Sequence, residues 1–134
     1  MSKILLACRD DDLRGSCKGQ LEDDGYLVHW VTSGEDALDY VQSHEVDLVI
    51  LHADVADRDC SAILEVLRSF RPDVSVVLTS NHFDYWNNFM TWLADACLVP
   101  SPDLAELKET VGMLLEARRE EGSVTTTQFA VDWQ

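Results

Sequence analysis

The chain has 134 residues, the size of one ordinary domain with a single core. Hydrophobic residues make up 46% of it, which excludes global disorder, and no apolar run approaches the length of a membrane span. With 25 acidic and 10 basic residues the formal net charge is −15, which argues against partners such as nucleic acid or an anionic membrane surface. The first apolar residues are too soon interrupted by Arg9 to form a signal peptide, so we expect a cytoplasmic protein.

Short apolar runs alternate with segments of helical periodicity in the first part of the chain. A run without helical spacing predicts a strand, whereas apolar residues three or four apart predict a helix. In chain order the patterns predict a strand at 3–7, a helix around 13–21, a strand at 26–31, a helix after Ser33 and a strand at 48–51. Asp24-Gly25 is expected to close the first helix, and Thr32-Ser33 before acidic residues is expected to cap the second.

The same alternation continues to the last third of the chain. We predict a helix at 61–70, a strand at 74–79, an aromatic-rich helix at 83–93, a strand at 97–99 and a last helix from about Asp103, a plausible N-cap. Five strand–helix repeats predict a parallel sheet covered by helices on both sides. Residues 1–118 are therefore expected to form one domain. Residues 119–134 are expected to form an acidic and then Thr-rich tail, in which 120–123 look like a linker.

Polar residues follow the third predicted strand directly. His52 and Asp54 come right after the apolar run at 48–51, and Asp57 and Asp59 follow. Functional sites in open α/β sheets form at the carboxyl ends of the strands, so a site is expected here. The four cysteines are widely spread and include no C-x-x-C pair, so neither a disulfide framework nor a zinc site is expected.

Local motifs occur along the chain in the order found in one known domain family. They are Lys3-Ile-Leu-Leu, Leu21-Glu-Asp-Asp-Gly-Tyr26, Ser33-Gly-Glu-Asp-Ala-Leu38, Asp47-Leu-Val-Ile-Leu51, Val76-Val-Leu-Thr-Ser80 and Ala94-Asp-Ala96, with Pro102 before the last helix. Over roughly residues 3–116 the chain resembles the response-regulator receiver domain of two-component signalling. The resemblance implies a flavodoxin-like (βα)5 fold, an α/β doubly wound sheet of five parallel strands in the order 2-1-3-4-5.

The resemblance also implies a site with four chemical parts. In the family, an aspartate at the end of the third strand accepts a phosphoryl group from a histidine kinase, and two acidic residues at the end of the first strand hold a divalent metal. A Thr or Ser ending the fourth strand and a Lys-Pro ending the fifth contact the phosphoryl oxygens. The metal and the lysine are needed to neutralise the charge that develops on the transferred group.

When the family's site positions are matched to this sequence residue by residue, most of the four parts are missing. Cys8 and Arg9 occupy the positions of the acidic pair, and His52 occupies the position of the phosphoacceptor. Ser101-Pro102 stands where Lys-Pro is usual, whereas Thr79 keeps its family identity. The resemblance therefore implies an atypical receiver, or pseudo-receiver, that holds no metal or other cofactor at this site and is not an enzyme.

Such a domain is expected to signal through protein–protein contact. The implied partner is a histidine kinase, an output protein or a second copy of the chain, which includes a homodimer. The family uses the surface of the fourth helix, fifth strand and fifth helix for these contacts. Tyr85 and Trp92, seven residues apart, share one face of the predicted fourth helix and are candidate partner residues on that surface.

Two other readings remain open. In the first, the chain is an active phosphorelay receiver in which Asp54 or an unconventional residue is the acceptor, although the run before His52 matches the family's pre-acceptor run and favours His52 in that position. In the second, Cys8, His52 and Thr79 form a rebuilt site for a small ligand or a metal. Against both stands the simpler interpretation, that His52 is an uncharged plug and that Arg9 pairs with neighbouring aspartates in place of a cation.

Overall fold

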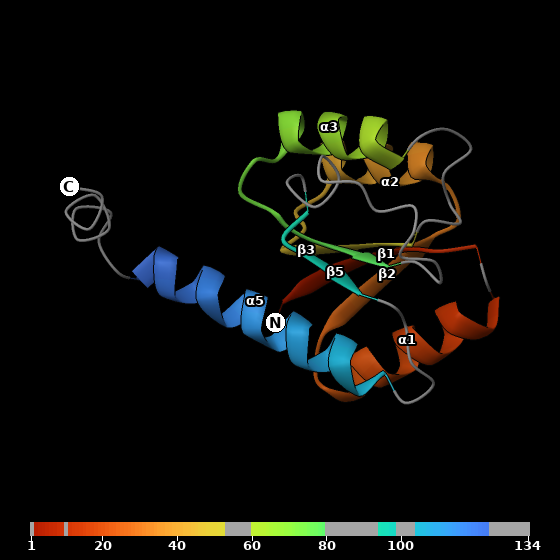
Figure 1. Cartoon of the computed structure of the whole chain (residues 1–134), viewed down its shortest axis with the longest axis vertical. Coiled ribbons are helices and arrows are strands. Elements are labelled where there is room, and N and C mark those ends of the chain that lie inside the picture. Colours follow the sequence, from red (N-terminus) through yellow and green to blue (C-terminus); the bar gives the residue numbers. More distant parts are fainter. Residues whose placement is uncertain (1, 10, 53–59, 80–93, 99–103, 124–134) are drawn as a thin grey trace.

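Five short strands lie side by side in one parallel sheet (Figure 1). The structure is a computed structural model that describes residues 2–9, 11–52, 60–79, 94–98 and 104–123. Its elements are β1 (Lys3–Ala7), α1 (Asp11–Asp23), β2 (Leu27–Val31), α2 (Gly34–Ser43), β3 (Leu48–His52), α3 (Cys60–Phe70), β4 (Ser75–Thr79), β5 (Ala96–Leu98) and α5 (Ala105–Ser123). The strand order is β2-β1-β3-β4-β5, and every neighbouring pair is parallel. The predicted fold class and strand order are thus confirmed.

The helices cover the sheet on both faces. In Figure 1, α2 and α3 lie on one side of the strands, and α1 and α5 lie on the other. Leu5 of β1 packs with buried side chains of α2 and α3, whereas its neighbours Ile4 and Leu6 pack with those of α1 and α5. This alternation follows from the two-residue period of a strand, and it produces two cores, one on each face of the sheet.

Helix ends in the first half of the chain follow the local sequence. Gly25 has a φ of 96°, a left-handed conformation that glycine adopts without a side-chain penalty, and α1 ends just before it. The Oγ of Ser33 accepts a hydrogen bond from the backbone N–H of Asp36 at 3.1 Å, so Ser33 caps α2. Both expectations from the sequence are confirmed.

The last helix begins at Ala105, close to its predicted start, and the carbonyl of Leu104 accepts a hydrogen bond from Lys108 N at 2.9 Å. Asp103, the predicted N-cap, lies outside the described residues. Leu104 has a φ of 58° and is 2% exposed. Burial of this side chain, worth about 2 kcal/mol, offsets a left-handed backbone that costs about 1 kcal/mol.

At its other end α5 continues to Ser123, so residues 120–123, which were expected to look like a linker, are helical. Figure 1 shows the C-terminal turns of α5 extending past the sheet. Glutamate, alanine and arginine are good helix formers, and they fill residues 116–121, which explains the continuation. The predicted helix at 83–93 and the tail beyond residue 123 lie outside the described residues. Within the described ranges, no helix combines the length and apolar character that a membrane span requires.

Close packing of α2 on α3 generates the first prediction. A Cβ added to Gly34, which is buried at the start of α2, would lie well inside contact distance of the Cδ1 of Ile63 in α3. We expect Gly34→Ala to lower the free energy of unfolding by about 1 kcal/mol, because the end of the Ile63 side chain must move aside and this cost exceeds the gain that alanine brings to a helix. Urea denaturation followed by circular dichroism measures the change.

Gly19 of α1 supplies the matched control, because a Cβ there meets nothing within 4 Å. Gly19→Ala is expected to raise stability by about 0.5–1 kcal/mol, as alanine does inside a helix. The double variant Gly34→Ala with Ile63→Val removes the clashing methyl group and should recover part of the loss. Equal effects of the two glycine substitutions would contradict the packing argument.

Candidate functional site

Three polar residues meet at the carboxyl edge of the sheet. His52 ends β3 and is the register partner of Thr79, which ends β4. Cys8 follows Ala7, the register partner of Leu51, and therefore lies at the level of His52. The side chains are deeply buried, with exposures of 1% for Cys8, 4% for His52 and 3% for Thr79. The structure thus brings together three of the residues that the sequence singled out.

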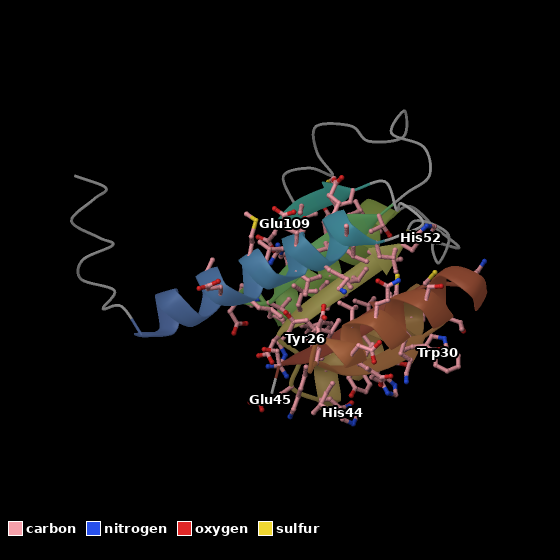
Figure 2. The ribbon with its side chains drawn as sticks, turned by 90° about the horizontal axis from the view of Figure 1, so that it is seen from below. Tyr26, Trp30, His44, Glu45, His52 and Glu109 are labelled. Atoms are coloured by element: carbon pink, nitrogen blue, oxygen red, sulfur yellow. The ribbon has the colours of Figure 1, made fainter. Side chains whose placement is uncertain are left out.

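The three residues also share one face of the sheet. Leu6, Ile50 and Val77 are register neighbours, and all three pack in the core beneath α1 and α5. Since strand side chains alternate, the residues two positions further along, Cys8, His52 and Thr79, belong to the same face. Figure 2 shows His52 at the end of the sheet strands. We call Cys8, His52 and Thr79 the edge row, in which His52 is the central member.

Cys8 extends the backbone ladder of β1. Its N–H donates to the carbonyl of Val31 at 3.1 Å, so the chain is still paired with β2 at this position. The side chain packs in the same core cluster as Cys17 of α1. This backbone pairing fixes the thiol of Cys8 in the core. In the receiver domains that the sequence resembles, a carboxylate that binds a cation is expected at this position.

Arg9 lies at the rim, on the β2 side of the edge row. It is exposed, and its Nε donates to the carbonyl of Thr32, just beyond β2, over a long 3.4 Å. The guanidinium therefore reaches toward the capped start of α2. The aspartates that were predicted to pair with Arg9 lie outside the described residues. The same is true of the other candidate site residues Asp54, Tyr85, Trp92, Ser101 and Pro102.

The donor set of the described edge residues does not fit a hard divalent cation. Magnesium prefers carboxylate and other oxygen ligands, whereas Cys8 offers a buried thiol and Arg9 brings a positive charge. A metal-ligating group of three or more His, Cys, Asp or Glu side chains does not occur among the described residues. These side chains fill the carboxyl edge of the sheet. They do not supply the oxygen ligands for the metal that phosphoryl transfer needs.

Two arrangements escaped the sequence reasoning. The ring of Tyr40 in α2 is stacked between His29 of β2 and His44, with ring centroids 4.2 Å apart on each side. Asp95 joins β4 to β5: its Oδ2 accepts from Val76 N at 2.7 Å and from Arg68 Nη2 at 2.8 Å. The four-residue spacing of Tyr40 and His44 could have predicted their contact, because residues four apart lie on the same face of a helix. Nothing in the sequence indicated the contact of His29 with Tyr40.

Comparisons with known proteins support the receiver fold described above. A family model described as the response regulator receiver domain matches residues 4–111. The crystal structure of the response regulator protein TrrA from Thermotoga maritima, in complex with Mg²⁺-BeF, superposes with a TM-score of 0.79 at 29% identity, covering 85% of this chain and 99% of that chain. A CheY-like receiver domain protein from Methanospirillum hungatei JF-1 superposes with a TM-score of 0.82 at 21% identity, covering 90% and 98% of the two chains, which shows the shared fold alone.

Two further relatives are connected with histidine kinases. TrrA in its complex with the histidine kinase ThkA matches with a TM-score of 0.77 at 30% identity, covering 86% of this chain and 99% of that chain. The sensor kinase CckA of Brucella abortus (strain 2308) is 29% identical over 117 residues, which is 84% of this chain. The chain spans 12% of the length of that kinase.

The buried cysteine next to the edge row predicts a pH effect. Burial raises the pKa of the Cys17 thiol from its ordinary 9.0 to about 11. Above pH 9 the unfolded chain therefore releases a proton that the folded chain keeps, so the stability present below that pH is lost as the pH rises toward 11. We expect the free energy of unfolding to fall by about 2–3 kcal/mol across this range.

Urea denaturation at a series of pH values measures this loss for the wild type and for Cys17→Ala. Burial also raises the pKa of Cys97, which adds a smaller effect of the same sign in both proteins. The alanine variant should be less stable at neutral pH because of the cavity, but its stability should fall less steeply above pH 9. Identical pH slopes for the two proteins would contradict the assignment to Cys17.

Proposed function

Because the chain belongs to the response regulator receiver domain family, we propose that it is a pseudo-receiver of two-component signalling. In this proposal the domain keeps the receiver scaffold but not the phosphotransfer chemistry. It acts through contacts with other proteins, and it is not an enzyme. Its conformation is fixed or is set by a bound partner, which stabilises whichever conformer it binds more tightly.

The burial of His52 at the centre of the edge row is the observation that carries this proposal. The ring ends β3, pairs in register with Thr79 and is 4% exposed. A carboxylate at this position would form the acyl phosphate of the family, and an imidazole does not. A ring enclosed in the core is also poorly placed to meet a kinase or a phosphodonor.

The neighbours of His52 support the same conclusion through electrostatics. The transferred phosphoryl group needs compensating positive charge from a metal, and that metal needs oxygen ligands. Cys8 and Arg9 occupy the positions of the acidic pair, and Ser101 occupies the position of the lysine. Thr79 retains its hydroxyl but, in this proposal, has no phosphoryl oxygen to contact.

The proposed partner is a histidine kinase, an output protein or a second copy of the chain. TrrA has been crystallised with a histidine kinase, and CckA is itself a sensor kinase, which supports a partner of the kinase class. We place the contact on the family's surface of fourth helix, β5 and α5, with Tyr85 and Trp92 as contact residues. Met113 of α5, 64% exposed, adds an apolar side chain to the α5 side of this surface.

A small-molecule phosphodonor tests the loss of phosphotransfer. We expect incubation with acetyl phosphate and Mg²⁺ to leave the intact mass of the full chain unchanged, because no described group provides the metal site that the reaction requires. Tryptophan fluorescence should also remain constant. Mass spectrometry at neutral pH, before acid can hydrolyse an acyl phosphate, is the measurement.

Two variants sharpen this experiment. The first restores the family's chemistry with Cys8→Asp, Arg9→Asp, His52→Asp and Ser101→Lys, and its folding is checked by circular dichroism; a gain of one phosphoryl group there shows that the assay detects the reaction on this scaffold. The second is Asp54→Asn in the otherwise unchanged chain. A wild-type adduct that disappears in Asp54→Asn would overturn the proposal in favour of an active receiver.

A further inference from the structure

β2 presents an open edge of the sheet. In the part of the chain that the structure describes, it is the outermost strand and pairs with β1 alone. The N–H of Leu27 donates to the carbonyl of Ser2 at 2.9 Å, and the carbonyl of Val31 accepts from Cys8 N at 3.1 Å, so these residues direct their backbone groups toward β1. Alternate residues of a strand direct them to opposite sides. Val28 therefore presents its N–H and C=O to the outside.

The strand lacks the features by which edge strands usually avoid pairing. Such strands commonly carry a charged residue, a proline or a bulge. The sequence of β2 is LVHWV, and its register with β1 is unbroken over five residues. The uncharged stretch extends from Gly25 to Gly34, in a chain of which 26% of the residues are charged. β2 is therefore suited to accept another strand.

Exposed apolar side chains lie on both sides of this edge. Leu27 is 51% exposed and Trp30 is 41% exposed. Their positions in the strand differ by an odd number, so they lie on opposite faces of the sheet. Figure 2 shows Trp30 beside α1, on the outer side of the sheet. A strand added to this edge would cover apolar surface on both faces.

We propose that the occupant of this edge is the β2 strand of a second copy of the chain. Antiparallel pairing about a two-fold axis at His29 places Leu27 opposite Val31 and Val28 opposite Trp30, so apolar side chains meet on both faces. The strand is self-complementary in this sense, and a two-fold contact of this kind closes as a dimer. The two five-stranded sheets then form one continuous sheet.

Charge sets the strength of this dimer. Each copy carries a formal charge of −15, so two copies repel each other. β2 itself contains no carboxylate, and the centre of the proposed interface is therefore free of opposing acidic side chains. Asp24 of one copy and Glu35 of the other approach at the ends of the paired strands, and salt screens this repulsion. A five-residue strand pair also buries less than the roughly 1,200 Å² of standard interfaces, so the dimer is weak.

The dimer proposal goes beyond the pseudo-receiver function and concerns a different surface. Sedimentation equilibrium of the full chain, up to millimolar concentration and at low and high salt, tests it. The weight-average mass should rise toward that of a dimer with concentration, and more so at high salt. In Leu27→Glu and Val28→Pro the dissociation constant should increase by about tenfold or more, because the glutamate adds a negative charge between two acidic copies and the proline removes an N–H donor from the pairing.

Phe70→Glu is the matched control, because it makes the same kind of change on α3 at an apolar side chain that is 47% exposed. It should dimerise as the wild type does. Hydrogen exchange by NMR adds a local readout: the amide of Val28 should exchange more slowly as the concentration rises. A monomeric wild type, a dimer that persists in both β2 variants, or an equal loss in Phe70→Glu would each overturn the proposal, and none would alter the phosphodonor result.

Discussion

The burial of β3 on both faces is the constraint from which the rest of the structure follows. All five of its residues, including His52, are buried. Val49 and Leu51 pack with α2 and α3, whereas Leu48 and Ile50 pack with α1 and α5. Each fully buried aliphatic side chain contributes about 1.5–3 kcal/mol, and a slip of one residue would exchange the two faces, so the register is strongly specified. That register alone decides which side chains share the carboxyl edge.

Among the described residues, the register places a packed row of side chains at that edge. Cys8, His52 and Thr79 follow core residues of three adjacent strands and are themselves buried to the same degree. A carboxylate in such surroundings would require a compensating charge, and a thiol, an imidazole and a hydroxyl lie there in its place. Arg9, which does carry a charge, stays exposed at the rim. The scaffold is thus that of a receiver, while the side chains at its edge are those of a core.

Much of this organisation was predictable, because local signals and burial agreed. The apolar run at 48–51 predicted β3. Ser33 and Gly25 predicted the start of α2 and the end of α1, because a single residue determines each of these helix ends. Two features depended on tertiary packing and were not predictable. Leu104 has a left-handed backbone because the core holds its side chain, and the stack of His29 on Tyr40 joins residues of different elements. Sequence alternation likewise did not reveal that β2 exposes Leu27 and Trp30 at an open edge.

The central claim is that the edge row does not hold the cation on which receiver chemistry depends. A magnesium titration followed by NMR of the backbone amides of Cys8, His52 and Thr79 tests it most directly. A hard cation bound beside these residues would shift their amide resonances along a saturable curve. The structure predicts that the three amides show no saturable shift at millimolar Mg²⁺. A saturable shift of all three, reversed by a chelator, would contradict the claim.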